Sequence, residues 1–253
     1  MDRLRIAVLG ASGYTGADLV RLALTHPGVE IAALGANQKA GQSMESIWPH
    51  FAAAPGLPLL QRVEDIDFAG IDVVFGCLPH GASAALLAGL GAPRIIDLSA
   101  DFRLRDAATY ADWYGGPHPA PALLDAAVYG LSEFARARLP GARLVACPGC
   151  YPTAALLALL PLAEAGLIAP EGISIFALSG VSGAGRSLKE ANLFCEAAEG
   201  AAAYALGHTM AITAAGVFGH EIVAWLSTRE RNVRYVRRAL GAVVVIAGIG
   251  QLL

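Results

Sequence analysis

Charged residues are scarce in this chain of 253 residues. Asp, Glu, Lys and Arg together make up 15% of it, whereas hydrophobic residues make up 55%. A chain so poor in charge and so rich in apolar residues can bury a large core, which argues against intrinsic disorder and favours an α/β protein. Its length suits one large domain or two modest ones.

An excess of positive charge is also absent. The formal net charge is −3, so the molecule as a whole does not attract the phosphate backbone of a nucleic acid. We therefore expect no nucleic-acid partner.

Cysteines are few, and nothing marks the chain for secretion. It has four cysteines, and at its N-terminus only residues 6–9 form an apolar run before the first glycine. That run is too short for the core of a signal peptide. Cysteines without a secretory signal predict reduced thiols and a cytoplasmic location.

The C-terminal stretch is apolar but short. Residues 239–253 are apolar apart from Gln251, and five arginines lie just before them, between Arg229 and Arg238. Fifteen residues are few for a helix that crosses a membrane. We expect no membrane partner, and a tail that contacts a membrane is the alternative.

A glycine-rich turn follows the first apolar run. Residues 6–9 are typical of a strand and residues 17–24 of a helix, with the spacing G-x-x-G-x-x-G between them. A strand, a glycine turn and a helix in this order begin a dinucleotide-binding fold. An ordinary tight turn is the alternative. The candidate cofactor-binding residues here are Gly10, Ser12, Gly13, Tyr14, Thr15 and Gly16.

The second predicted strand, residues 29–34, is followed by no acidic residue. NAD-selective proteins usually have Asp or Glu near this point to bind the ribose hydroxyls. Here residues 35–39 contain no acid and end in Lys39. A cation without a carboxylate suits the 2′-phosphate of NADP, so we predict NADP as the cofactor. The alternative for Lys39 is a solvated loop lysine.

Further strands and helices alternate along the first half. The predicted strands are residues 71–77, 94–98 and 143–146, and a predicted helix covers residues 82–90. This alternation predicts a parallel sheet with functional sites at the carboxyl ends of its strands.

Two segments with polar side chains fall at such strand ends. Pro79 and His80 follow one strand, and Arg103 follows the next. Each also has a structural interpretation. His80 could be a hydrogen-bonded loop histidine, and Arg103 could pair with Asp101 or Asp106.

Residues 145–153 hold two of the four cysteines. Pro148 and Gly149 predict a turn, and the apolar run 154–160 predicts a helix, so Cys150 is expected where a loop enters a helix. The amides and partial positive charge of a helix N-terminus stabilise a thiolate. Cys150 is therefore a candidate nucleophile.

These cysteines have three other interpretations: a core residue, a redox pair and half of a metal site. Cys150 could be a small buried core residue. Cys147 and Cys150 could form a redox pair, because they have the Cys-x-x-Cys spacing. A metal site would need a second pair, and Cys77 and Cys195 stand alone in the sequence, so we expect no metal.

Five motifs in one order resemble the N-acetyl-gamma-glutamyl-phosphate reductase family of arginine biosynthesis. They are residues 10–16, 78–81, 97–103, the cysteine stretch with Ala154 and Pro161, and 179–186. The aspartate-semialdehyde dehydrogenases are the nearest related class. The segments Asp-Leu-Ser-Ala-Asp-Phe-Arg and Pro-Gly-Cys-Tyr-Pro-Thr favour the first family.

The resemblance implies a Rossmann-type parallel-sheet domain at residues 1–148 that binds NADPH. It implies the start of an α+β substrate (dimerisation) domain at residues 149–207. Cys150 would attack an acyl phosphate and form a thioester, which hydride from NADPH would reduce to N-acetyl-glutamate semialdehyde. A related acyl phosphate, such as an aminoadipyl phosphate, is the alternative substrate. The family also implies a homo-oligomer.

The resemblance further implies roles for individual residues. Arg103 and Arg186 would bind substrate anions, because a guanidinium binds phosphate or carboxylate in a fork. His208 is the positional match to the acid/base histidine. The other cofactor-binding candidates are Pro79, Ser182 and Gly183.

From residue 208 onward the chain departs from the family pattern. Family members are normally longer than this chain, and the residues around His208 differ from theirs. We interpret residues 208–253 as a divergent tail, foreign to the family, as after a frameshift or truncation. A terminal strand or helix is the folded alternative. An inactive or weak dinucleotide-binding remnant is therefore the alternative to an active reductase.

Overall fold

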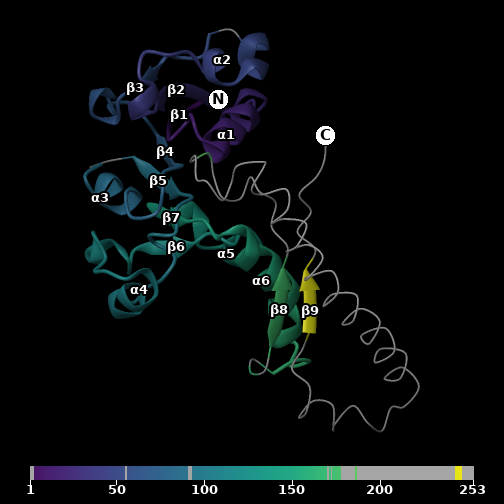
Figure 1. Cartoon of the computed structure of the whole chain (residues 1–253). Helices are drawn as coiled ribbons and strands as arrows, with labels where there is room; N and C mark the ends of the chain where they lie inside the picture. The colour runs from purple at the N-terminus through teal and green to yellow at the C-terminus, as the bar shows by residue number, and fades with distance from the viewer. Residues whose placement is uncertain are drawn as a thin grey trace, which may run out of the picture. The chain divides into compact units, whose positions relative to one another are not determined.

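The structure is a computed structural model that describes residues 3–54, 56–90, 93–169, 171, 173–175 and 186, and the backbone of 176–177 and 243–246. The chain divides into two units, Met1–Gly149 and Cys150–Leu253 (Figure 1).

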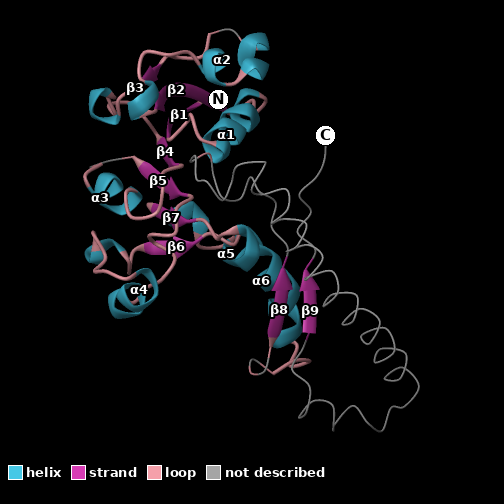
Figure 2. Cartoon of the chain, viewed as in Figure 1, coloured by secondary structure: helices cyan, strands magenta, loops and turns pink. Residues whose placement is uncertain are grey.

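The first unit is built on a seven-stranded sheet in which every neighbouring pair is parallel (Figure 2). The strand order is β3-β2-β1-β4-β5-β7-β6. The strands are β1 (Leu4–Leu9), β2 (Val29–Gly35), β3 (Leu60–Gln61), β4 (Val73–Gly76), β5 (Arg94–Asp97), β6 (Ala127–Tyr129) and β7 (Leu144–Ala146). This doubly wound order confirms the predicted α/β, Rossmann-type fold.

Short helices connect the strands of this unit. The α-helices are α1 (Tyr14–Leu24), α2 (Met44–Ile47), α3 (Ser83–Ala88), α4 (Ala107–Tyr114) and α5 (Ser132–Ala135). The 3₁₀ helices are η1 (Asn37–Lys39), η2 (Pro49–Ala53), η3 (Val63–Asp65), η4 (Pro121–Leu123) and η5 (Leu139–Gly141).

Apolar side chains of the central strand β1 alternate between two cores. Ile6 and Val8 belong to the same buried cluster as Val20 of α1. Ala7 and Leu9 belong to a second cluster, which includes residues of α3. Because successive side chains of a strand point to opposite faces, a strand buried on both sides reads as one continuous apolar run. The pattern therefore explains why residues 6–9 were recognisable as a strand.

The predicted strands are confirmed with boundaries that differ by one or two residues. The helix predicted at residues 17–24 begins three residues earlier, and the one at 82–90 is shorter at both ends. Strands β3 and β6 and helix α4 were not predicted. Their lengths of two, three and eight residues leave little periodic pattern to detect.

The described part of the second unit begins with α6 (Cys150–Glu164), an α-helix of 15 residues. Strands β8 (Ser174–Ala177) and β9 (Val243–Ile246) pair in parallel. Strand β9 comes from the predicted tail, whose other residues lie outside those described. Within the described chain, no helix has both the length and the apolar character needed to cross a membrane.

Candidate functional site

The glycine turn between β1 and α1 leaves no room for side chains at two of its positions. Gly10 has φ +84°, and a Cβ atom there would lie 2.2 Å from the carbonyl oxygen of Cys77. A Cβ atom at Gly16 would lie 2.3 Å from the carbonyl oxygen of Gly10. The close approach of β1, β4 and α1 therefore requires both glycines.

Gly13 differs, because the protein itself leaves space beside it. A Cβ atom there would meet only the carbonyl oxygen of Gly10, at 3.4 Å. Gly13 is also the N-cap of α1, which has no side-chain cap and no acidic residue in its first turn. An uncompensated helix N-terminus with open space beside it fits an anion such as a dinucleotide pyrophosphate.

The neighbours of Gly13 in the turn are accessible to a ligand. Tyr14 and Thr15 are exposed, and Ser12 is half-buried. The Tyr14 ring lies against the Trp48 ring, with 5.4 Å between their centroids. The turn thus presents two exposed side chains and backbone amides at one end of the sheet.

The end of β2 carries an exposed cation. Lys39 is the last residue of η1 and is exposed. Asn37 holds this short helix in place, because its Oδ1 accepts a 2.9 Å hydrogen bond from the Val63 amide. Lys39 therefore lies after β2, where the sequence predicted a contact for a 2′-phosphate.

The turn that contains Pro79 and His80 is anchored by a buried carboxylate. Asp101 is fully buried, and its Oδ1 lies 2.5 Å from His80 Nδ1. It also accepts hydrogen bonds from the amides of Gly81 and Ala84, each 2.9 Å long. His80 is thus a hydrogen-bonded loop histidine, while Pro79 is exposed in the same turn.

A second buried carboxylate, Asp97, ends strand β5. It accepts hydrogen bonds from the hydroxyls of Ser83 and Ser99, at 2.7 Å and 2.6 Å, and from the Ser99 amide. Burial raises the pKa of Asp97 above its ordinary value, and these hydrogen bonds offset only part of that effect. Sequence reasoning included Asp97 in the motif 97–103 but assigned no role to Asp97 or Ser83; an acid at the end of an apolar strand was the available signal.

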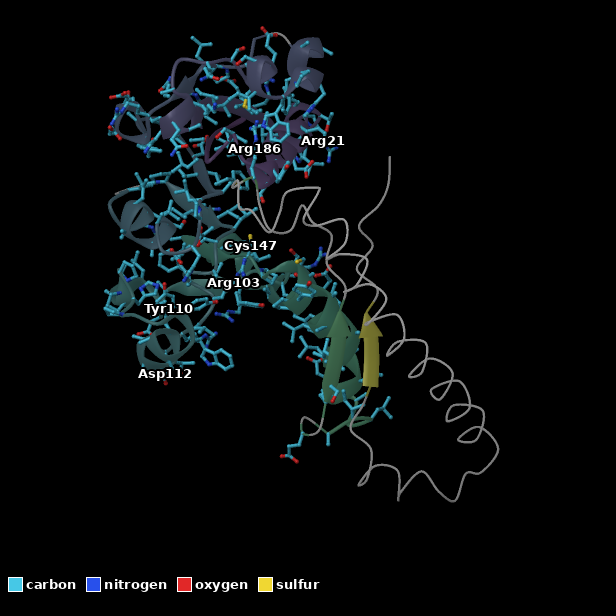
Figure 3. All side chains as sticks on the ribbon, viewed as in Figure 1. Arg21, Arg103, Tyr110, Asp112, Cys147 and Arg186 are labelled. Atoms are coloured by element: carbon cyan, nitrogen blue, oxygen red, sulfur yellow. The ribbon has the colours of Figure 1, made fainter. Side chains whose placement is uncertain are left out.

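Arg103 reaches from the turn after β5 to the cysteine stretch (Figure 3). Its Nε donates to the carbonyl oxygen of Cys147 at 2.8 Å, and its Nη2 donates to that of Leu98 at 3.0 Å. Asp101 and Asp106 make other bonds, the latter as N-cap of α4. The suggested ion pair of Arg103 with either of them is therefore wrong.

The three described cysteines lie in different environments. Cys150 is exposed and is the first residue of α6. Burial raises the pKa of the Cys77 thiol to about 12 and that of the Cys147 thiol to about 11. At neutral pH these two thiols stay protonated, whereas Cys150 combines exposure with a helix N-terminus.

The remaining predicted residues are only partly described. Arg186 is exposed. Ser182, Gly183 and His208 lie outside the described residues. Among the described residues, no group of three or more His, Cys, Asp or Glu side chains could hold a metal ion.

Comparison with known proteins gives two matches to models of protein families. The model described as "Semialdehyde dehydrogenase, NAD binding domain" matches residues 5–142. The model described as "Semialdehyde dehydrogenase, dimerisation domain" matches residues 150–210.

Individual relatives carry more specific names. The N-acetyl-gamma-glutamyl-phosphate reductase of Rhodospirillum rubrum is 53% identical over 212 residues, which cover 81% of this chain and 60% of the relative. That of Cereibacter sphaeroides is 54% identical over 80% of this chain and 59% of its own length. A probable chloroplastic N-acetyl-gamma-glutamyl-phosphate reductase of Arabidopsis thaliana is 54% identical over 79% of this chain and 50% of its own length. The chain thus spans between half and three fifths of the relatives it matches.

Proposed function

Because the chain belongs to the semialdehyde dehydrogenase family, we propose that it reduces N-acetyl-gamma-glutamyl phosphate with NADPH, as in arginine biosynthesis. The observation that carries this proposal is the placement of Cys150, an exposed thiol that begins a helix of 15 residues. The relatives named above support the choice of substrate, and the turn between β1 and α1 supports the choice of a dinucleotide.

The first unit would hold the cofactor. The space beside Gly13 and the amides that begin α1 suit the pyrophosphate. Lys39 would neutralise the 2′-phosphate, and Pro79 would contact the cofactor from the turn after β4. Ser182 and Gly183 are proposed as further cofactor contacts. When bound, NADPH supplies the hydride that reduces the acyl group.

Cys150 would make and break the covalent bond to substrate. Its thiolate attacks the carbonyl carbon of the acyl phosphate. The bond between this carbon and the bridging phosphate oxygen breaks, and inorganic phosphate leaves with the electron pair. The resulting thioester is the species that is reduced. The carbon–sulfur bond then breaks, which releases N-acetyl-glutamate semialdehyde and restores the thiolate. We propose His208 as the acid/base group.

Two arginines would bind the anionic parts of the substrate. The Nε and Nη2 atoms of Arg103 donate hydrogen bonds to two backbone carbonyls. Its Nη1 donates no hydrogen bond within the described part of the chain and suits a phosphate or carboxylate. Arg186 is the second candidate, and it is exposed.

The second unit would mediate assembly. The match of residues 150–210 to a dimerisation domain supports a homo-oligomer, and the proposed chemistry suits the reducing cytoplasm. A mass of one chain in light scattering would contradict the oligomer.

The activity is tested by the oxidation of NADPH in the presence of the acyl phosphate, with aspartyl phosphate as the competing substrate. We expect Cys150→Ser to abolish reduction and leave NADPH binding intact, while Cys147→Ser keeps most activity. Reduction by Cys150→Ser would contradict the proposed nucleophile. NADPH binding without turnover in the unaltered chain would support the alternative, a dinucleotide-binding remnant.

A further inference from the structure

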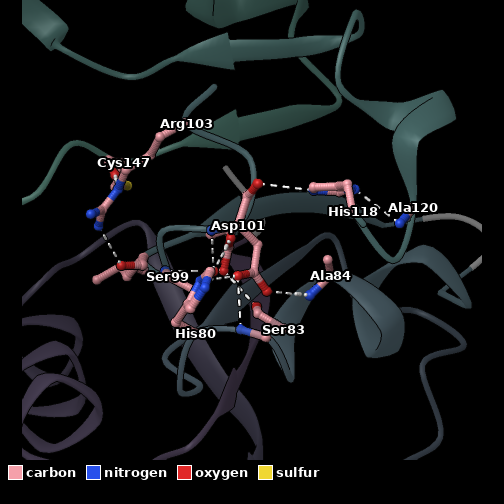
Figure 4. Close-up of polar contacts among 12 residues, drawn as sticks. His80, Ser83, Ala84, Ser99, Asp101, Arg103, His118, Ala120 and Cys147 are labelled. Carbon is pink, nitrogen blue, oxygen red and sulfur yellow. Dashed lines mark hydrogen bonds and ion pairs between the residues drawn. The ribbon is translucent and has the colours of Figure 1, made fainter. Parts of the chain in front are cut away.

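The guanidinium of Arg103 joins the ends of two neighbouring strands (Figure 4). Strands β5 and β7 pair as far as Asp97 and Ala146, and the Cys147 amide extends the ladder with a 2.8 Å bond to the Asp97 carbonyl. Within the part of the chain that the structure describes, no backbone amide donates to the carbonyl of Cys147. Arg103 Nε donates to this carbonyl at 2.8 Å.

The same side chain also binds the backbone directly after β5. Arg103 Nη2 donates to the Leu98 carbonyl at 3.0 Å, while the Leu98 amide donates to Gly76 of β4 at 2.9 Å. Nε and Nη2 lie on one edge of a planar guanidinium, so the distance between the two carbonyls is set by a rigid group. Lysine carries a single ammonium group and cannot reproduce this fork.

The turn that carries Arg103 is itself held by buried hydrogen bonds. Ser99 donates through its hydroxyl to Asp97 and accepts at 3.1 Å from the Asp101 amide. The Asp101 carbonyl lies 2.9 Å from His118 Nε2, and the Ala120 amide donates to His118 Nδ1. Since Nδ1 accepts a hydrogen bond from the Ala120 amide, Nε2 is the donor to the Asp101 carbonyl.

We propose that Arg103 is a positioning residue that fixes the loop leading into Cys150. Cys147 is three residues before Cys150, so a bond that fixes the Cys147 carbonyl limits the backbone paths open to Pro148 and Gly149, the two residues that lead into Cys150. The catalytic consequence rests on the proposed function, but the effect on the thiol does not. This role uses the Nε–Nη2 edge and is distinct from an anion contact through Nη1.

The test compares Arg103→Lys with Arg105→Lys, the same substitution at an exposed arginine two residues later. Each full-length protein is labelled with limiting iodoacetamide, without substrate or cofactor, and the labelled cysteines are mapped by mass spectrometry. We expect Arg103→Lys to slow the labelling of Cys150 by roughly threefold or more, because the loop before Cys150 is no longer fixed at the Cys147 carbonyl. Labelling of Cys77 should not change, and Arg105→Lys should match the unaltered chain.

Two outcomes would overturn the proposal. In the first, Cys150 labels at its original rate in Arg103→Lys while only the KM for substrate rises, which assigns Arg103 to substrate binding alone. In the second, Cys77 and Cys150 change together, which indicates general loss of structure. A fall in kcat larger than the rise in KM would support positioning. An inactive enzyme would refute the proposed function, yet the labelling would still decide the role of Arg103.

Ser99→Ala is the second variant if Arg103→Lys does not fold. It removes the hydroxyl that ties the turn to Asp97 but leaves Arg103 in place. We expect slower labelling of Cys150 by roughly twofold, again with Cys77 unchanged. Unaltered labelling of Cys150 in folded Ser99→Ala would overturn the proposal.

Discussion

At the scale of single residues, the described thiols differ in burial and in their place in the fold. The pKa values of Cys77 and Cys147 are raised to about 12 and about 11 by burial, and Cys150 is exposed at a helix start. Only a thiolate reacts readily with an alkylating agent. A difference in reactivity between neighbouring cysteines therefore reports the environment of each.

We predict that Cys150 reacts with iodoacetamide at pH 7 at least about tenfold faster than Cys77 or Cys147. Raising the pH toward 11 should increase the labelling of Cys147, since its thiol ionises near that value, although unfolding must be excluded by circular dichroism. Peptide mapping after limiting reaction is the measurement. Preferential labelling of Cys147 at neutral pH would contradict the prediction.

Asp97 gives a prediction about pH and stability. Its pKa is raised in the folded protein, chiefly by burial, so the folded state holds this proton more tightly than the unfolded chain does. The contribution of Asp97 to the free energy of unfolding must then fall as the pH rises from the ordinary value of 3.8 through the raised pKa. Above that window this loss of stability is complete.

We therefore expect Asp97→Asn to be more stable relative to the unaltered protein at about pH 7 than at about pH 4. Urea unfolding at several pH values measures this difference. Asp112→Asn, at an exposed position on α4, is the matched control and should leave the pH profile unchanged. Parallel profiles for Asp97→Asn and the unaltered chain would show that Asp97 does not titrate differently on folding.

At the scale of elements, the β1–α1 turn separates glycines needed for folding from one that leaves space for a ligand. At Gly10 and Gly16 an added Cβ would lie 2.2 Å and 2.3 Å from backbone atoms. Because these neighbours are backbone and not side chain, no change of rotamer can remove the clash. At Gly13 the nearest contact is ordinary, and φ is −80°. The same substitution should thus have different effects along one turn.

We predict that Gly10→Ala and Gly16→Ala each lower the free energy of unfolding by about 2 kcal/mol or more, because backbone must move. Gly13→Ala should stay within about 1 kcal/mol of the unaltered protein and weaken NADPH binding roughly tenfold by filling the space beside the helix N-terminus. Urea unfolding and fluorescence titration measure the two effects. Gly141→Ala, where a Cβ meets nothing within 4 Å, is the control. If Gly13→Ala binds NADPH as tightly as the unaltered protein, the pyrophosphate does not bind beside Gly13.

At the scale of the whole molecule, cofactor choice is the property most directly open to measurement. No acid follows β2, and Lys39 is exposed at the end of η1. We predict that the full chain binds NADPH more tightly than NADH. Lys39→Glu should weaken NADPH binding about tenfold and change NADH binding little, since only NADPH carries the 2′-phosphate.

Arg136→Glu makes the same change of charge at an exposed position after α5 and should preserve the preference. Equal affinities of the unaltered chain for the two cofactors, measured by titration, would contradict the prediction. If Lys39→Glu retains the full preference, another group binds the phosphate.

The sequence by itself determined the five longer or flanking apolar strands β1, β2, β4, β5 and β7, the helices α1 and α3, the glycine turn and the start of α6. These features depend on neighbours in the chain: apolar runs predict buried strands, and Pro148 and Gly149 interrupt the chain before an apolar helix. Strands β3 and β6 escaped detection because two or three residues carry no periodicity. Pairing with neighbouring strands, β3 with β2 and β6 with β7, makes them strands.

Only the tertiary structure decided which polar side chains act together. Asp97 and Ser83 are 14 positions apart, and Arg103 binds the carbonyl of a residue 44 positions later. Parallel strands bring such residues to one edge of the sheet, and burial then makes every donor and acceptor there require a partner. The position of Arg103 after a strand predicted that it belongs to a site. Its bond to the Cys147 carbonyl could not be predicted, because it depends on β7 lying beside β5 in the sheet.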